Sequence, residues 1–300
     1  STEEQIGSGG TGNVAVGDGA GTAITTGNYN TALGYDALYT EDTASKSTGV
    51  GTSALQVQNA GTVDAYNTAV GFAAGVAVTT GIQNTLIGGL AGDAINTGDE
   101  NVTVGYNSLT TNTKSFYNVA VGNSALAAHN LTSDAAGYNT GIGHNAGAAV
   151  TTGVNNTLIG ALAGDALTDA DYNVSLGAYT LTGDTLGSKS TAIGYAALPT
   201  TNFTTSTSSF NTAVGAYAGV AVTTGIQNTF VGGLAGDATD DGSYNVAVGL
   251  QALSANCGNR NTAVGESALS LTTVSNNTGI GNGAGKTLST GANNTFVGSA

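Results

Sequence analysis

The sequence predicts an all-β fold, a parallel β-solenoid of about 17 coils, and three observations lead to it. A five-residue motif recurs from end to end, apolar residues alternate within that motif, and the composition provides few large side chains. Of 300 residues, 48 are Gly, one is Pro, none is Met or Trp, and only 8% are charged. Such a chain cannot fill a thick core, but coils that stack on their neighbours bury a thin one.

The repeated motif reads Asn-(Thr/Val)-x-(Val/Ile/Leu)-Gly, and we number its residues as positions one to five of each coil. Most copies lie 17 residues apart. We expect the position-one side chain to hydrogen-bond nearby backbone or to stack in a ladder with the next coil. The copies start at Asn13, Asn30, Ser47, Asn67, Asn84, Asn101, Asn118, Asn139, Asn156, Asn173, Ser190, Asn211, Asn228, Asn245, Asn261, Asn277 and Asn294.

The alternation within the motif predicts which side chains face inward. Successive side chains of a strand point to opposite faces, so positions two and four share one face. Because this face carries only Thr, Val, Ile or Leu, we expect it to form the interior, with Val70, Ile87, Ile142 and Ile159 buried in one column. The Gly at position five allows a turn that a Cβ would obstruct. These structural glycines include Gly71, Gly88, Gly105, Gly122, Gly143, Gly160, Gly177 and Gly194.

A longer period of four coils overlies the first. Position nine is only ever Gly or Leu, mostly in pairs, and this pattern defines blocks that start near residues 67, 139 and 211. We expect the Gly/Leu column to mark close packing, within the coil or between chains. The three longer coils each end a block, with their extra residues in 56–66, 127–138 and 199–210. These insertions are expected to bulge outward as loops.

Residues 1–12 are expected to form a lead-in segment before a repeat domain at 13–300. With five Lys and Arg against nineteen Asp and Glu, the net charge of −14 argues against nucleic acid as a partner. No apolar stretch reaches the roughly 18 residues of a membrane helix, so no membrane insertion is expected. We expect no enzyme and no cofactor, because His129, His144 and Cys257 form no catalytic constellation. His129 falls within the predicted insertion at 127–138 and is expected to be exposed.

Acidic residues recur in the second coil of each block and are weak candidates for metal ligands. Several carboxylates on one coil suit Ca²⁺, which prefers several oxygen ligands. Solvated surface charge is the favoured interpretation, because the spacing of these residues varies between blocks. The candidates are Asp93, Asp99, Glu100, Asp165, Asp169, Asp171, Asp237, Asp240 and Asp241.

Aromatic residues and insertions are the best candidates for contact with a receptor. Six Tyr and one Phe stand immediately before position one, and a Tyr offers a flat apolar face and a hydroxyl that suit a sugar or a protein. A stacked ladder that packs the coil corner or a subunit interface is the competing interpretation. The insertions qualify because they often map to the binding face of a solenoid. The predicted contacts are Tyr66, Asn130, Tyr138, Phe203 and Phe210.

Three elements of the repeat, Thr31–Gly34, Thr68–Gly71 and Thr191–Gly194, each follow Asn or Ser and precede an Ala three residues beyond the Gly. In this form the repeats, from residue 13 to 300, resemble the heads of YadA-type trimeric autotransporter adhesins and related repeats of bacteriophage tail fibres. The resemblance implies a left-handed β-roll, a side-by-side homotrimer, and an extracellular fibre on a virion or cell surface that contacts a host glycan or protein. The coil is longer than in that family, and we expect no stalk, neck or anchor within residues 13–300.

Several alternatives stay open. Val16–Gly21 fits the hexapeptide rule of left-handed β-helix acyltransferases, but only one such hexapeptide occurs per coil where that fold needs three. In function, the alternatives are a secreted filament that assembles end to end and an ice-binding solenoid. Against ice binding, the Thr ladder at position two is expected to share the buried face with the aliphatic column.

Overall fold

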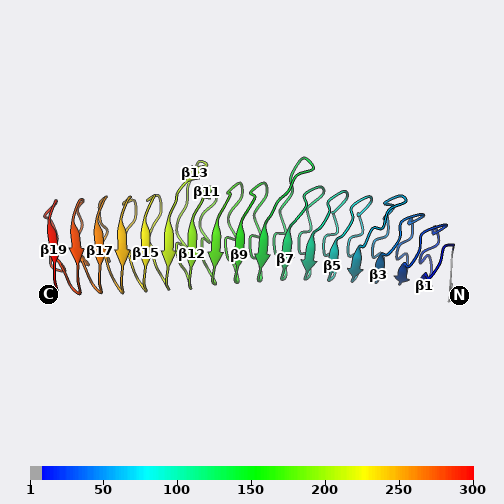
Figure 1. Cartoon of the computed structure of the whole chain (residues 1–300), viewed down its shortest axis with the longest axis horizontal. Coiled ribbons are helices and arrows are strands. Elements are labelled where there is room, and N and C mark those ends of the chain that lie inside the picture. The colour runs from blue at the N-terminus through cyan, green and yellow to red at the C-terminus, as the bar shows by residue number, and fades with distance from the viewer. Residues whose placement is uncertain (1–8) are drawn as a thin grey trace. The chain divides into compact units, whose positions relative to one another are not determined.

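The computed structural model describes residues 9–300 and confirms an all-β parallel β-solenoid of about 17 coils. A three-residue strand forms at positions two to four of each of the seventeen motifs, and residues 9–300 contain no helix (Figure 1). Of the predicted lead-in segment 1–12, residues 1–8 lie outside the described residues. The chain divides into two compact units, Ser1–Val154 and Asn155–Ala300.

Over residues 9–154 the first unit has eight strands, each paired in parallel with the next. Equivalent positions of neighbouring coils are partners, as with Thr68 and Thr85. The strands are β1 (Val14–Val16), β2 (Thr31–Leu33), β3 (Thr48–Val50), β4 (Thr68–Val70), β5 (Thr85–Ile87), β6 (Val102–Val104), β7 (Val119–Val121) and β8 (Thr140–Ile142).

The second unit is built in the same way, from stacked parallel strands, and has a small additional sheet. Its motif strands are β9 (Thr157–Ile159), β10 (Val174–Leu176), β12 (Thr191–Ile193), β14 (Thr212–Val214), β15 (Thr229–Val231), β16 (Val246–Val248), β17 (Thr262–Val264), β18 (Thr278–Ile280) and β19 (Thr295–Val297). Two further strands, β11 (Gly187–Ser188) and β13 (Thr207–Ser208), pair in parallel where the insertion folds against the preceding coil. The motif did not predict this pair.

A ladder of buried Asn side chains joins successive coils at position one. The Oδ1 atom of Asn84 accepts the backbone N–H of Asn101 at 3.0 Å, and its Nδ2 atom donates to the carbonyl of Gly98 at 2.9 Å. The same pattern recurs in the second unit, where Asn156 accepts from the N–H of Asn173. The ladder therefore satisfies backbone groups at a corner where the strand ladder does not reach.

Glycine at position five is required by the close approach of neighbouring coils. Gly71 has φ of 143°, and a Cβ added to it would lie 2.4 Å from the carbonyl oxygen of Gly88. Gly160 stands in the same relation to Gly177, also at 2.4 Å. No side chain fits between backbones at that separation, so the turn after each strand depends on Gly.

The middle residue of each strand, at position three, faces inward, and this overturns the predicted orientation. It is buried in every coil except the last, as at Ala69, Leu86 and Phe230. Positions two and four point outward, and Val70, Ile87 and Ile142 remain 37–39% exposed. Ile159 is likewise only partly buried. The prediction that Val70, Ile87, Ile142 and Ile159 form a buried column is therefore wrong.

The narrow interior explains this orientation. Leu126, at position nine, leaves so little space that a Cβ on Gly141 at position three would lie 2.8 Å from its Cγ atom. A large residue at position three fits only where position nine is Gly, since Cβ atoms on Gly75 and Gly92 would lie 2.4 and 2.9 Å from Leu86. The interior accepts one side chain from each strand, whereas positions two and four would supply two.

The Gly/Leu column at position nine is part of the core, as predicted. Leu109, Leu126, Leu181 and Leu198 are fully buried by residues of their own chain. Their φ angles of 49–51° lie in the left-handed region, which costs a side chain roughly 1–2 kcal/mol. Burying a Leu contributes roughly 1.5–3 kcal/mol, so Leu is tolerated there as well as Gly. The four-coil period thus alternates the source of core volume between positions nine and three.

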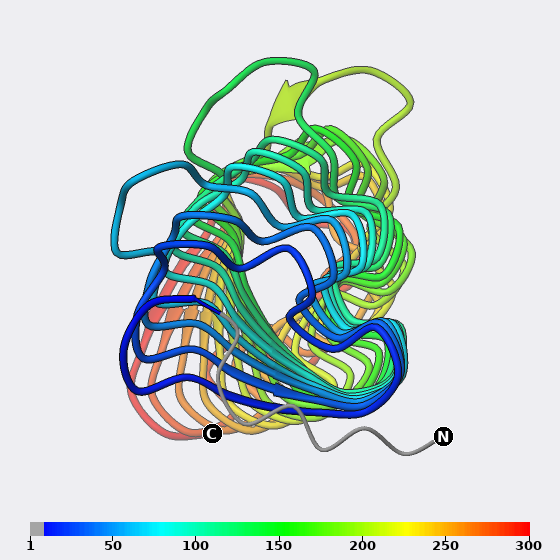
Figure 2. The ribbon, with the colours of Figure 1, turned by 90° about the vertical axis from the view of Figure 1, so that its right-hand side faces the viewer.

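The three insertions project from the coils as loops. Figure 2 shows the loops near residues 60 and 133 in the first unit, and the loop near residue 205 in the second, extending beyond the stacked turns around them. Each begins with Asn after position twelve: Asn59, Asn130 and Asn202. The N–H of each Asn still donates to the following coil, as from Asn130 to Thr151 at 2.9 Å, so the extra residues enter only after that bond.

Candidate interaction surfaces

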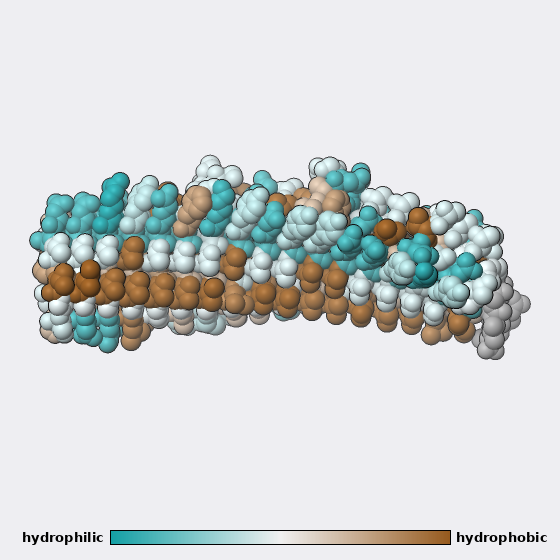
Figure 3. Space-filling model, in the orientation of Figure 1, coloured by the Kyte–Doolittle hydropathy of each residue, from teal (hydrophilic) through white to brown (hydrophobic). Residues whose placement is uncertain are grey.

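Within each unit, the outward residues at positions two and four form a continuous surface, here called the outer apolar face. In each unit a hydrophobic stripe runs across the strands (Figure 3). Position four is Val, Ile or Leu in all seventeen coils, and position two is Thr or Val. Leu33, Leu176 and Ile280 are 43–45% exposed. Monomeric soluble proteins rarely expose so extended an apolar surface, and such a surface marks an interaction site.

The outer apolar face carries no charge. No Asp, Glu, Lys or Arg occupies position two or four in any coil, although the chain as a whole has a net charge of −14. Repulsion between two like-charged chains would therefore be weakest where these faces meet. The arrangement suits apposition with another apolar sheet face.

The aromatic residues immediately before position one lie at the surface, and we call this line of residues the corner row. Tyr66, Tyr138 and Phe210, predicted as receptor contacts, are 49–55% exposed. Tyr117 and Tyr138 stack with ring centroids 5.3 Å apart and an angle of 8° between the rings. Phe116 packs edge-on against Tyr117 at 5.1 Å. The stacked-ladder interpretation thus holds for this pair.

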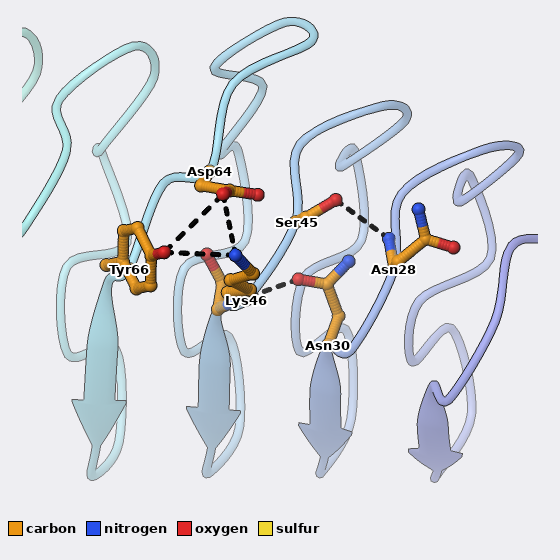
Figure 4. A network of polar contacts seen from close by, with 7 residues as sticks. Asn28, Asn30, Ser45, Lys46, Asp64 and Tyr66 are labelled. Atoms are coloured by element: carbon orange, nitrogen blue, oxygen red, sulfur yellow. Dashed lines mark hydrogen bonds and ion pairs between the residues drawn. The ribbon is translucent and has the colours of Figure 1, made fainter.

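Elsewhere in the corner row, cations replace the second ring. The Nζ atom of Lys46 lies 5.0 Å from the centroid of the Tyr66 ring and 2.7 Å from Asp64, and it donates to the Tyr66 hydroxyl at 3.0 Å (Figure 4). The hydrogen bond to Asp64 raises the pKa of Lys46. Lys189 lies similarly over Phe210, and Arg260 over Tyr244. Three of the five basic residues therefore lie against exposed aromatic rings in this row.

The loop residues predicted as receptor contacts are less available than expected. The Asn130 Oδ1 atom accepts hydrogen bonds from the N–H and hydroxyl of Thr113, at 3.2 and 2.9 Å. Phe203 is only 6% exposed, so its prediction as a contact is wrong. The carboxylate of Asp184 accepts the N–H groups of Gly187 and Phe203, which draws the loop inward, and the ring then covers Gly187, where a side chain would obstruct it.

His129 is buried, contrary to the expectation of an exposed loop residue. It occupies position twelve, which faces inward in nearly every coil and precedes the inserted residues. Its Nε2 atom lies 3.1 Å from the hydroxyl oxygen of Ser115, and burial lowers the pKa of His129 to about 4. Position twelve is also polar in the other coils that have Leu at position nine. Two of these residues are Glu41 and Gln58, and the Gln58 side chain donates to the Glu41 carboxylate at 2.7 Å.

The acidic candidates for metal binding are not brought together. Within residues 9–300, no group of three or more His, Cys, Asp or Glu side chains is placed to hold a metal ion. Asp93 and Asp240 instead accept hydrogen bonds from Thr110 and Thr223, and Asp99 accepts the N–H of Ile82 at 2.8 Å. These carboxylates tie neighbouring coils together.

Burial raises the pKa of the Cys257 thiol, which opposes its use as a nucleophile.

Sequence reasoning missed a cluster of three tyrosines in the second unit. Tyr179, Tyr195 and Tyr217 follow β10, β12 and β14, and their rings contact one another on successive coils. They occupy positions six or seven, where half of the other coils have only small or polar residues. The signal available in the sequence was an aromatic residue one or two places after the position-five Gly in three consecutive coils.

Comparison with known proteins adds no identification. No protein-family model and no curated protein matches the chain. The likeness to adhesin and tail-fibre repeats therefore rests on the repeat residues themselves. Across residues 9–300, no helix is present that has the length and apolar character needed to cross a membrane.

Proposed function

We propose that this chain is a structural and adhesive fibre segment whose copies associate side by side through the outer apolar face. The observation that carries the proposal is the uninterrupted, uncharged aliphatic column left exposed on the strands of each unit. In agreement with the family that the repeats resemble, the proposed assembly is a left-handed, parallel homotrimer at a virion or cell surface.

The energetics of the outer apolar face support self-association. Burying the exposed part of one position-four side chain contributes roughly 1 kcal/mol, about half the value for a fully exposed Val or Leu. Over the repeated coils the sum is on the order of 10–20 kcal/mol per chain. Association costs roughly 4–15 kcal/mol in lost rotational and translational freedom. A long, regular face therefore offsets that cost even though each coil contributes little.

The corner row and the loops would stay outside such an assembly. Three copies side by side would present Tyr66, Tyr138 and Phe210 as repeated exposed groups, with the insertions beside them. Weak contacts repeated in this way bind a host glycan or surface protein by avidity. Adhesion is thus the proposed role of the corner row, and distance-spanning is the proposed role of the stacked coils.

Replacing apolar residues on the proposed interface tests the assembly. We expect the wild-type chain to have the mass of a trimer in mass photometry. The variant Ile87→Glu/Leu176→Glu, with one charge on each unit, should have the mass of a monomer. Its circular dichroism spectrum should be unchanged, since both side chains point outward. The matched control is Tyr29→Glu/Tyr172→Glu, which places the same charges on the exposed corner row and should stay trimeric.

Two results would contradict the proposal. A monomeric wild-type chain at micromolar concentration would remove self-association through this face. A glutamate variant that stays trimeric would show that association uses another surface. An assembly that grows without limit, with mass rising with concentration, would favour the alternative of a secreted end-to-end filament.

Ice binding is a second candidate function, because the structure removes the argument that the Thr ladder is buried. The Thr ladder at position two lies outside rather than in the core, beside the aliphatic column, on regularly spaced strands. Thr and Val rows on a flat β face can order water at an ice surface. Thermal hysteresis by a monomeric chain would favour this function over the fibre, while a trimer without hysteresis would exclude it.

A further inference from the structure

The tyrosine cluster of the second unit is an exposed aromatic surface built on three successive coils. The ring centroids of Tyr179 and Tyr195 are 5.7 Å apart, and those of Tyr195 and Tyr217 are 5.3 Å apart. Interplanar angles of 69° and 74° make both contacts edge-to-face. The residues are 42–48% exposed, so the rings contact one another and solvent at the same time.

The turns that carry the cluster are uncharged. The three turns that carry the tyrosines, residues 176–181, 193–198 and 214–219, contain no Asp, Glu, Lys or Arg. The chain as a whole is strongly acidic, with a net charge of −14. A polyanion would be repelled by this field, and a cation would find no carboxylate in these turns. The cluster therefore offers aromatic surface and hydroxyl groups without a charge partner.

We propose that Tyr179, Tyr195 and Tyr217 form a binding surface for a neutral, β-linked hexose polymer. The C–H faces of a pyranose ring pack on aromatic rings, and equatorial β-linkages keep both faces of each sugar flat. The ring centroids recur every 5.3–5.7 Å from coil to coil, so successive rings can contact sugars along an extended chain. Tyr hydroxyls add hydrogen bonds to sugar hydroxyls. A neutral chain avoids the repulsion that an acidic polysaccharide would meet.

This surface goes beyond the proposed function and does not depend on it. Five of the seven rings of the corner row contact a cation or one another, whereas the cluster has three rings and no cation. Self-association through positions two and four uses Leu176, Ile193 and Val214, which precede the tyrosines in the same coils. A chain that never assembled would still present the cluster, so failure of one proposal is distinguishable from failure of the other.

Binding to hydroxyethyl cellulose, a soluble neutral β-glucan, tests the inference. Affinity electrophoresis of the full chain in its native oligomeric state should show retardation by this polymer. Carboxymethyl cellulose, which has the same backbone with added charge, should bind at least about tenfold more weakly. Tyrosine emission reports binding directly, because the chain has no Trp.

Variants then locate the site. The triple variant Tyr179→Ala/Tyr195→Ala/Tyr217→Ala should bind at least about tenfold more weakly than wild type. The triple Tyr→Phe variant keeps the rings and should stay within about threefold of wild type. The control Tyr35→Ala/Tyr106→Ala removes exposed tyrosines of the first unit and should bind like wild type. If the triple Ala variant loses its circular dichroism signal, the single variant Tyr195→Ala, at the centre of the cluster, replaces it.

Three results would overturn the inference. Wild-type chain that is not retarded by hydroxyethyl cellulose would remove the site, including the case in which assembly covers it. Equal retardation of wild type and a folded Ala variant would move the binding elsewhere. Equal affinity for the neutral and charged celluloses would exclude selection for a neutral chain.

Discussion

An exchange of core volume between Phe230 and Gly236 would test the packing that sets the four-coil period. Phe230 is fully buried at position three, and a Cβ on Gly236 at position nine would lie 2.6 Å from its ring. Phe230→Ala should cost about 4 kcal/mol through lost burial and the cavity. Gly236→Leu alone should cost about 3 kcal/mol, because the new side chain clashes with the ring and adopts a positive φ.

The double variant should be more stable than these costs predict separately. With the ring gone, the leucine introduced by Gly236→Leu would occupy the vacated space, as Leu does at position nine of other coils with φ of 49–57°. Its burial returns about 2 kcal/mol, and the left-handed conformation costs about 1 kcal/mol. The double variant should then lose about 3 kcal/mol in total, against about 7 kcal/mol if the two sites were independent.

Urea unfolding followed by circular dichroism measures all four free energies of unfolding. The coupling between the two sites is the quantity of interest, and the first-unit pair Leu86 and Gly92 provides a replicate with the same geometry. Additive losses in both pairs would refute the view that positions three and nine share one space. The control Gly232→Leu should lower the free energy of unfolding by more than Gly236→Leu does. A Cβ added to Gly232 would lie 2.6 Å from the carbonyl oxygen of Gly249, and this backbone atom cannot move aside as a side chain can.

Three further predictions follow from the buried polar groups and the loops. Burial lowers the pKa of His129 from 6.5 to about 4, so as the pH falls the unfolded chain binds a proton before the folded chain does. The contribution of His129 to the free energy of unfolding should therefore be complete above about pH 6.5 and fall by about 3 kcal/mol by pH 4. Urea titrations at a series of pH values should show this fall in wild type and not in His129→Gln. Asn84→Ala should cost about 2–5 kcal/mol, because the N–H of Asn101 and the carbonyl of Gly98 lose their partner, whereas Asn84→Ser, the residue found at Ser47, should cost less in thermal melts. Trimming the insertions in 56–66, 127–138 and 199–210 to the standard coil length should leave the fold intact and lower adsorption to host cells at least about tenfold, and unchanged adsorption would exclude the loops as contacts.

The parts of the fold that could be predicted from sequence are those that each coil repeats. Strands at the motif, the Asn ladder and the outward loops follow from local rules that hold in every coil. Thr85, for example, pairs with equivalent residues because identical coils stack in register. Phe203 and His129 could not be placed in this way. Each occurs once, and its burial depends on contacts with another coil, with Gly187 and Ser115 respectively.

The sequence by itself determined the coil, the strand positions and the alternation of faces, because the period of two and the period of seventeen are both properties of the chain. Only the tertiary structure decided which face is inside. The alternation of side chains along a strand defines two faces but does not say which of them is buried. Here position three on one face and positions two and four on the other are both largely uncharged and apolar, so hydrophobicity does not distinguish the two faces. The side-chain volume that the interior can hold decides which face is buried. Leu126 fills the space opposite Gly141, and Leu86 fills the space left by Gly75 and Gly92. These pairs lie in different turns or coils, and their fit exists only once the chain has closed on itself, which leaves the bulkier aliphatic column on the surface.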